Sequence, residues 1–269
     1  MVRKGNTLQI MDWVKKPSEH ETKISAHFNG KVRYDGAPIF DKPFVALLFT
    51  NRCGSNLFAE YLVNTGYIGG MGEATNFPGV IRRSTKFGID NYAGFVRHEA
   101  EAVLAKGRHF GMKVSVTQLA MLLRWNILGM FPGMVVYHVV RDDLLGQAIS
   151  MSIAKQTGQW TSKQEAKPAD PEFQFNTISQ IVERTALNNA SGRLLVESIG
   201  APYRQFRYEE FTANPEPHIR DALGMIGIAP ETLKLPEATL KKQANALNDS
   251  FRAKFLGHLV SQGTLRGQP

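Results

Sequence analysis

The amino-acid sequence predicts an α/β fold of three layers, in which helices flank a mostly parallel central sheet, as in phosphate-loop proteins. Short apolar runs rich in β-branched residues alternate along the chain with segments of helical periodicity, which is the pattern of such folds. The clearest apolar runs are residues 44–50 and 134–140, which contain no Lys, Arg, Asp or Glu. A run of this kind indicates a strand that is buried on both faces, as parallel sheets require.

The first predicted strand, residues 44–50, passes through a short polar turn into a helix predicted for residues 56–64. Residues 110–115 and 134–140 are the second and third strands, and each precedes a helical pattern. Units of strand, turn and helix place their turns at one edge of a parallel sheet, where ligands bind in such folds. The residues just after each strand are therefore the candidates for function.

The same alternation continues after the third strand. Asp142 and Asp143 stand where the capping carboxylate of the next helix is expected. After that helix we predict a charged loop at 161–174, a long helix at 178–200 and a short fourth strand at 203–208. A helix opened by an Asn-Pro pair follows from 214 onward, and a basic C-terminal helix is predicted at 236–260.

Residues 1–42 are polar apart from two short apolar clusters, and we expect an N-terminal arm that docks late or stays mobile. Residues 43–269 are expected to form a single domain, which is long enough to bury a large core without disulfides or metal. The single cysteine, Cys53, excludes an intrachain disulfide framework. No apolar run approaches the roughly 20 residues that span a bilayer, and no signal peptide is evident, so a cytoplasmic protein is expected.

The net charge of +8 suits nucleic acid, an anionic membrane or a small ligand with several phosphates. The basic residues are scattered, and no zinc-finger or RNA-binding signature is present, which weakens the nucleic-acid interpretation. A small ligand with several negative charges therefore remains a candidate partner. His109 and His138 have no partner at metal-ligand spacing, so we expect both to be structural and expect no bound metal.

The turn between the first strand and its helix is the sharpest functional signal. N–H groups at a helix start lack partners, and together with the helix dipole they form an anion site. Arg52 adds a planar cation suited to phosphate or sulfate oxygens. Gly54 allows close approach of the backbone, and Ser55 and Asn56 add side-chain donors. An ordinary tight strand–helix turn is the alternative interpretation.

This turn departs from the loop of metal-dependent kinases and NTPases. It is too short, and Arg52 precedes the glycine where a lysine should follow it. The lysine that reaches the β- and γ-phosphates and the hydroxyl that holds Mg²⁺ are therefore out of place. A phosphoryl-transfer enzyme with a degenerate loop remains as a weaker alternative.

Several short segments keep a fixed order between residue 44 and about residue 250. They are N-R-C-G-S-N-L-F at 51–58, T-G-Y-I-G-G-M-G-E at 65–73, F-G-M-K at 110–113, R-D-D at 141–143 with Q-A-I-S at 147–150, Q-T-G-Q-W at 156–160, and Y-E-E-F at 208–211 with N-P at 214–215. This ordered set resembles the motifs of the sulfotransferase family, most closely those of the branch that contains trehalose 2-sulfotransferase.

The resemblance implies metal-free transfer of a sulfuryl group from 3′-phosphoadenosine-5′-phosphosulfate (PAPS) to a hydroxyl of a small-molecule or glycan acceptor, with 3′-phosphoadenosine 5′-phosphate (PAP) as product. It also implies a homodimer. The residues that it assigns to the 5′-phosphosulfate are Arg52 and the N–H groups of Cys53, Gly54, Ser55 and Asn56. It assigns the 3′-phosphate to Arg141 and Ser150, the adenine to Tyr208 and the role of general base to Glu73.

Chemical reasoning adds two expectations. Lys113, at the end of the second strand, is placed to steady the transferring group or the acceptor. Repulsion from the phosphosulfate is expected to raise the pKa of Glu73. Each residue also has a plain structural alternative, in which Glu73 and Lys113 are surface charges, Arg141 pairs with a neighbouring aspartate, Ser150 is a tolerated helical serine, and Tyr208 packs in the core.

Three positions depart from the family pattern. Cys53 stands where the family has serine, Asn56 where it has threonine, and Asp142 where the branch has a second arginine. These departures keep open a non-catalytic member of the fold that binds a nucleotide. They also suggest a reactive thiol at Cys53, because a helix N-terminus and Arg52 would both lower its pKa.

Overall fold

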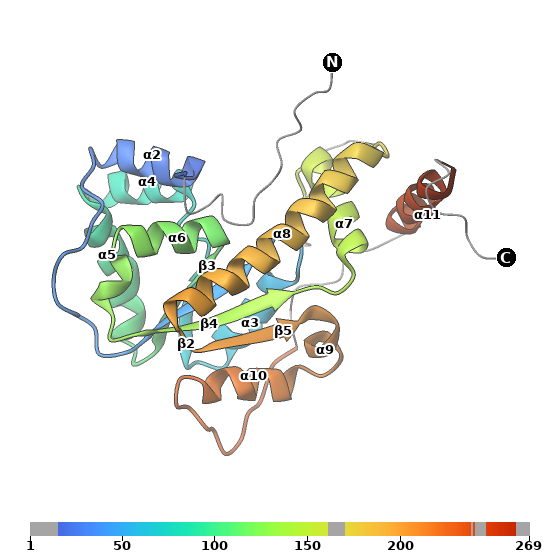
Figure 1. The fold of residues 1–269 in the computed structure, drawn as a ribbon. Helices are drawn as coiled ribbons and strands as arrows, with labels where there is room; N and C mark the ends of the chain where they lie inside the picture. The colour runs from blue at the N-terminus through green and yellow to red at the C-terminus, as the bar shows by residue number, and fades with distance from the viewer. Residues whose placement is uncertain (1–15, 161–169, 238, 240–245, 262–269) are drawn as a thin grey trace.

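The structure is a computed structural model that describes residues 16–160, 170–237, 239 and 246–261. A sheet with the strand order β2-β3-β1-β4-β5 forms its centre, and every neighbouring pair is parallel. The strands are β1 (Phe44–Phe49), β2 (Ile68–Gly72), β3 (His109–Val114), β4 (Met134–Val140) and β5 (Tyr203–Arg207). Helices cover both faces of this sheet (Figure 1), so the predicted three-layer α/β fold is confirmed.

The helices divide between two core layers and one outer group. The layer on one face of the sheet contains α3 (Ser55–Asn64), α9 (Tyr208–Ala213) and α10 (Pro215–Gly224). The layer on the other face contains α2 (Glu19–His27), α4 (Phe77–Phe87), α5 (Tyr92–Leu104), α6 (Val116–Arg124), the 3₁₀ turn η1 (Ile127–Met130) and α8 (Phe175–Ile199). A third cluster joins α7 (Leu144–Thr157), α8 and α11 (Ala246–Ser261).

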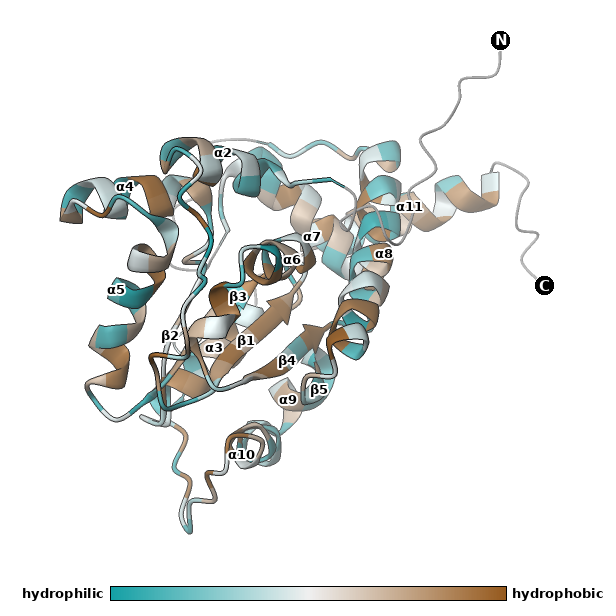
Figure 2. Cartoon of the chain, turned by 60° about the vertical axis from the view of Figure 1, so that its left-hand side comes forward, coloured by the Kyte–Doolittle hydropathy of each residue, from teal (hydrophilic) through white to brown (hydrophobic). Residues whose placement is uncertain are grey.

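The central strand β1 is buried along its whole length, because it has a strand on each side and a helix layer on each face. Alternate side chains of a strand point to opposite faces. Phe44, Ala46 and Leu48 accordingly pack with one helix layer, and Val45, Leu47 and Phe49 pack with the other. Figure 2 shows the hydrophobic colour concentrated on these inner strands.

The edge strand β2 was not predicted, because the sequence indicated only a glycine-rich loop there. Gly70 has a φ of +83°, and a Cβ at this position would lie 2.4 Å from the carbonyl oxygen of Gly111 in β3. Glycine therefore permits the close approach of the two strands. The same glycines remove the alternating apolar pattern by which a strand is recognised in a sequence.

Residues 16–42, expected to belong to a mobile or late-docking arm, pack against the rest of the domain. A capping box between Ser18 and Glu21 starts α2, and Ile24 is completely buried in the core. The carboxylate of Glu21 accepts a hydrogen bond of 2.8 Å from Nε of Arg124, at the end of α6. Residues 1–15 lie outside the described residues.

The remaining predicted elements are found with small differences at their ends. The helices α4 and α5 were not predicted, and neither was α2. Of the helix predicted for residues 236–260, α11 begins only at Ala246, and Pro236 and Glu237 are irregular. Residues 170–174 of the predicted charged loop are irregular, and its residues 161–169 lie outside the described residues. No helix in the described part of the chain is both long enough and apolar enough to cross a bilayer.

The buried position of Ile24 generates a prediction about residues 16–42. Replacing Ile24 by Ala should reduce the free energy of unfolding by about 2–5 kcal/mol, because it leaves a cavity in the core. Denaturant unfolding monitored by circular dichroism measures this change. The matched control is Ile39→Ala, whose side chain is 41% exposed and should cost less than about 1 kcal/mol. Equal costs for the two variants would contradict the docking of α2.

Candidate active site

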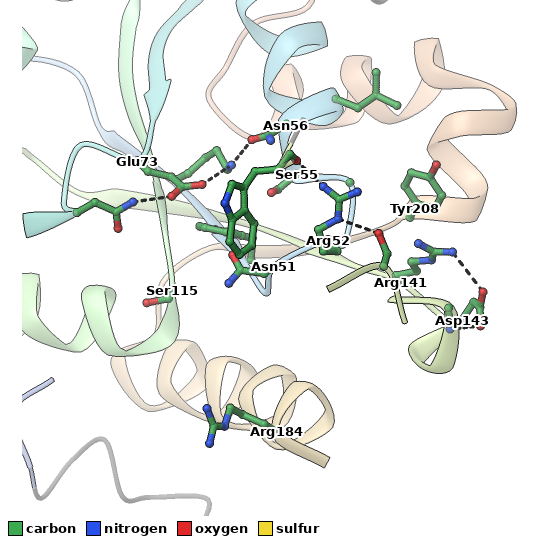
Figure 3. A pocket seen from close by; sticks show the side chains of 18 of the residues that line it. Asn51, Arg52, Ser55, Asn56, Glu73, Ser115, Arg141, Asp143, Arg184 and Tyr208 are labelled. Carbon is green, nitrogen blue, oxygen red and sulfur yellow. Dashed lines mark hydrogen bonds and ion pairs between the residues drawn. The ribbon is translucent and has the colours of Figure 1, made fainter. Parts of the chain in front are cut away.

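A cavity of about 1050 Å³ lies at the carboxyl edge of the sheet. All five strands contribute to it: Arg52 follows β1, Glu73 follows β2, Lys113 lies near the end of β3, Arg141 follows β4 and Tyr208 follows β5. Parallel strands end at the same edge, which is why residues so distant in sequence meet here. Figure 3 shows the side chains of Arg52, Glu73, Arg141 and Tyr208, which come from separate elements.

The loop between β1 and α3 bends sharply at two residues with left-handed backbone, Arg52 at φ +68° and Gly54 at φ +92°. A Cβ at Gly54 would lie 2.2 Å from Cδ2 of Tyr208, so the tyrosine ring closes over the loop only because this residue is glycine. Gly54 is also the N-cap of α3, and as a glycine it has no side chain with which to cap this helix. The start of α3 therefore has the character of an anion site.

The guanidinium of Arg52 is held across the mouth of this loop. Its Nε donates a hydrogen bond of 2.9 Å to the hydroxyl of Ser150 on α7, and the guanidinium also donates to the carbonyl oxygen of Trp160. Burial lowers the pKa of Arg52, and the positive charge of Arg141 lowers it further. Two predicted phosphate ligands, Arg52 and Ser150, are thus in direct contact, with a second cation close by.

Arg141 lies between an acid and an aromatic ring. Its Nη2 is 3.2 Å from Oδ2 of Asp143, so the predicted alternative, an ion pair with a neighbouring aspartate, is present. The guanidinium carbon stands 5.2 Å from the ring centre of Tyr208. The Nε atom of Arg141 is buried and makes no hydrogen bond among the described residues, although Oε1 of Glu209 lies 3.8 Å away as an ion-pair partner. Buried donors are normally satisfied, so this atom indicates a place for an acceptor atom of a ligand.

Asp142 and Asp143 have different surroundings. Asp143 caps α7 through the N–H of Gly146 at 2.9 Å and also binds Arg252 of α11 at 2.6 Å. Asp142, which stands where the resembling branch has a second arginine, forms an exposed ion pair with Arg207 at 2.9 Å. The departure at residue 142 is therefore directed away from the cavity and is matched by a surface cation.

Lys113 connects the side of the cavity near β2 with the start of α3. Its ammonium lies 3.0 Å from Oε1 of Glu73 and also hydrogen-bonds Oδ1 of Asn56, in the first turn of α3. The side chain of Lys113 is only 4% exposed, and its Nζ stands 4.4 Å from the ring centre of Phe49. A buried ammonium needs a counter-charge and hydrogen-bond acceptors. Glu73 and Asn56 supply them, which excludes a surface role for this lysine.

Glu73 is held by hydrogen bonds on both carboxylate oxygens. Lys113 contacts Oε1, and Nδ2 of Asn76 donates to Oε2 at 2.6 Å. Burial alone would raise the pKa of Glu73, but the charge of Lys113 and the two hydrogen bonds outweigh it, and the pKa is lowered. The upward shift expected beside a bound phosphosulfate stays a prediction, because the lowered pKa is that of the protein alone.

The sequence did not indicate the residues that support Glu73. Nε2 of Gln118, at the start of α6, donates to Oδ1 of Asn76 at 2.8 Å and so orients the amide that holds the carboxylate. His20 and Arg184 also line the cavity, from α2 and α8. One signal for Asn76 was present: the pattern Asn-Phe-Pro at 76–78 indicates a helix start, as Asn-Pro does at 214–215.

Cys53 is the one predicted site residue that does not line the cavity. Its side chain is completely buried in the core below the loop, and its N–H donates to the carbonyl oxygen of Thr50 at 3.3 Å. Burial raises the pKa of the thiol, more than hydrogen bonds and the charge of Lys113 lower it. The hypothesis of a reactive thiol is therefore wrong, because the side chain packs inward.

The histidines singled out in the sequence lie outside the cavity. Burial lowers the pKa of His138 to about 4, and its Nδ1 is 2.8 Å from the hydroxyl of Tyr203, which agrees with a structural role. Across residues 16–160, 170–237, 239 and 246–261, no group of three or more His, Cys, Asp or Glu side chains is arranged to hold a metal ion.

Fold and site together fit a protein that binds an anionic ligand, because a three-layer α/β fold holds a cationic cavity beside a carboxylate that is paired with a lysine. The profile of the Stf0 sulphotransferase family matches residues 121–256, which is just over half of the chain. The chain therefore belongs to the Stf0 sulfotransferase family, the family of trehalose 2-sulfotransferase. No curated protein sequence gives a match.

Solved structures show the same fold. The sulfotransferase domain of the Synechococcus PCC 7002 olefin synthase is 14% identical, with a TM-score of 0.53 over 88% of this chain and 98% of that chain. A sulfotransferase from Alicyclobacillus acidocaldarius is also 14% identical, with a TM-score of 0.46 over 82% of this chain and 94% of that chain. The first of these establishes the shared fold.

The contact between Lys113 and Glu73 generates a second prediction. Replacing Lys113 by Met should raise the pKa of Glu73, because burial remains while the main opposing charge is removed. In the wild type, the stabilisation from this pair is fully present above the ordinary pKa of 4.5 and is lost as the pH falls through the lowered folded value. A ¹³C NMR titration of the glutamate carboxyls measures the shift. Lys106→Met, at an exposed turn, is the control, and an unchanged Glu73 pKa in Lys113→Met would contradict the prediction.

Proposed function

We propose that this sulfotransferase moves a sulfuryl group from PAPS to a hydroxyl of a carbohydrate acceptor, with Glu73 as the general base. The contact that carries this proposal is that of Lys113 with both Glu73 and Asn56. Through this one buried ammonium, the carboxylate on the β2 side of the cavity is fixed against the anion cradle at the start of α3. A base and a site for a transferring anion are thereby adjacent, as this chemistry requires.

The residues of the β4–β5 side fit the donor nucleotide. Arg52, Arg141 and Ser150 gather there, the buried Nε of Arg141 makes no hydrogen bond, and Gly54 leaves room where a Cβ would collide with Tyr208. Two cations and the dipole of α3 favour a ligand that carries several negative charges. In this proposal Arg52 and the start of α3 bind the phosphosulfate, and Arg141 binds the 3′-phosphate.

When bound, PAPS supplies the sulfuryl group: its bond to the phosphate oxygen breaks while the acceptor oxygen bonds to sulfur, and PAP leaves with the electron pair. The carboxylate of Glu73 takes the proton of the attacking hydroxyl. Its lowered pKa keeps Glu73 ionised at neutral pH, and the negative charge of the donor would raise this pKa toward the value that suits a base. Lys113 and the first turn of α3 stabilise the charge that develops on the transferring oxygens.

The β2–β3 side of the cavity supports a carbohydrate acceptor. The lining of the cavity includes many polar hydrogen-bonding side chains, namely those of His20, Asn51, Asn76, Ser115, Thr117, Gln118 and Arg184. The ring of Phe49, 4.4 Å from Nζ of Lys113, adds an apolar surface. A site built from hydrogen-bonding groups selects ligands with many hydroxyls and rejects apolar ones. The homodimer and the cytoplasmic location expected from the sequence stay predictions.

Replacing Arg52 by Ala tests the donor site. Calorimetric titration of the wild type with PAP in the absence of magnesium should show binding, and Arg52→Ala should weaken it about 10- to 100-fold, the range for loss of a charge-assisted hydrogen bond. Arg193→Ala removes an exposed arginine that pairs with Glu197 and should leave PAP affinity unchanged. A wild type that prefers ATP with magnesium would overturn the donor assignment in favour of a phosphoryl-transfer enzyme.

Replacing Glu73 by Gln tests the base. Transfer of ³⁵S from labelled PAPS to trehalose and other disaccharides should fall about 100-fold or more. The affinity for PAP should stay within about twofold, because Glu73 is not among the residues proposed to bind the nucleotide. Release of PAP gives an independent measure of the same turnover. Wild-type rates in Glu73→Gln would remove Glu73 from the mechanism, and absence of transfer by the wild type despite PAP binding would favour a non-catalytic protein.

A further inference from the structure

The helix α4 begins directly behind Glu73, and its N-cap residue does not cap it. Asn76 has the extended backbone of an N-cap, but its side chain accepts nothing from the first turn of α4. An asparagine at this position normally accepts from the N–H of the second or third helical residue. Here the amide of Asn76 is used elsewhere: it donates to Glu73 and accepts from Gln118.

The first turn of α4 is satisfied by another route. The N–H of Phe77 donates to Nδ1 of His20 at 3.1 Å, Pro78 has no N–H to satisfy, and the N–H of Gly79 reaches the carbonyl oxygen of Asn76 at 2.9 Å. Buried backbone donors must find partners somewhere. His20, a side chain of α2, therefore binds the first N–H of α4, which the side chain of an N-cap residue does not reach.

This contact determines the protonation state of His20. A backbone N–H can only donate, so Nδ1 must be the unprotonated nitrogen and the neutral ring carries its proton on Nε2. Burial lowers the pKa of His20, which keeps the ring neutral, while Glu19 and Glu73 act in the opposite direction and Lys23 adds to the lowering. The ring also packs against Phe77, with centroids 5.5 Å apart.

We propose that His20 is a positioning residue for Glu73: by accepting from the N–H of Phe77, it fixes the start of α4 and with it Asn76, whose amide holds the carboxylate. Without Nδ1 at this place, the N–H of Phe77 would lose its partner, the start of α4 would shift, and Glu73 would lose the hydrogen bond on Oε2. Only the catalytic consequence rests on the proposed function of Glu73; the network of His20, Asn76 and Glu73 stands without it. Residues 18–27 therefore contribute to the active site in addition to packing against the core.

The test compares four histidine variants by the pKa of Glu73, measured by ¹³C NMR on protein labelled at the glutamate carboxyl carbons, with Glu73→Gln to assign the signal. His20→Ala should raise this pKa by about one pH unit, the size of one hydrogen bond to a charged group. His20→Asn should restore the wild-type value, because its amide oxygen takes the place of Nδ1. His20→Gln, whose amide lies nearer to the place of Nε2, should behave like His20→Ala.

His27→Ala is the matched control, because His27 makes the other histidine contact between α2 and α4, with Nε2 2.8 Å from the hydroxyl of Ser84. It should leave the pKa of Glu73 unchanged. An equal shift in His27→Ala would show that general loosening of α2 is responsible and would overturn the proposal, as would an unchanged Glu73 pKa in folded His20→Ala or no difference between the Asn and Gln variants.

The two proposals fail separately. PAP titration and the transfer assay on the same variants show whether nucleotide binding persists and whether turnover follows the Glu73 pKa. If Glu73→Gln retains full transfer while His20→Ala still shifts the pKa of Glu73, the role of Glu73 as base is wrong and the positioning network is right. If Glu73→Gln loses transfer and His20→Ala leaves both turnover and the pKa of Glu73 unchanged, the positioning role is wrong and the base is right.

Discussion

The buried ammonium of Lys113 is the constraint on which the rest of the site depends. A charge that is removed from water must be paired and hydrogen-bonded where it lies. Lys113 therefore requires Glu73 from the end of β2 and Asn56 from the start of α3, and it ties the edge strand to the central loop. The strand order β2-β3-β1 brings the three elements together. The contacts of Nζ of Lys113 therefore depend directly on the topology of the sheet.

The distribution of the other charges follows from the same physics. On the β4–β5 side, the positive charge of Arg141 lies close enough to lower the pKa of Arg52, while the acids nearby are engaged at helix ends. Asp143 is committed to capping α7 and binding Arg252. The result is an excess of positive potential at the start of α3, suited to a phosphosulfate, beside a region around Glu73 where charges are balanced and polar amides predominate.

The most regular elements could be predicted because local pattern and burial agree in them. The runs at β1 and β4 are apolar on both faces, and the Gly-Ser turn after β1 leads directly into α3. Residues 51–56, Lys113 and Arg141 could be predicted because the rule about carboxyl ends of parallel strands needs no tertiary detail. The assignments of Glu73, Ser150 and Tyr208 came from the resemblance to the family's motifs. All the residues predicted for the site, apart from Cys53, line one cavity. The strand β2 and the helix α2 escaped prediction, since glycines obscure the first and a mostly polar sequence obscures the second.

By itself, the sequence determined the parallel α/β fold, the anion-binding turn and the set of charged residues at strand ends, because each follows from periodicity or local backbone chemistry. Only the tertiary structure decided how these residues are used. Cys53 faces the core, Lys113 and two hydrogen bonds lower the pKa of Glu73 in the protein alone, and the amide of Asn76 holds this carboxylate instead of capping α4. Such outcomes depend on contacts between residues far apart in the chain, and no local pattern encodes which of two available partners a polar group will take.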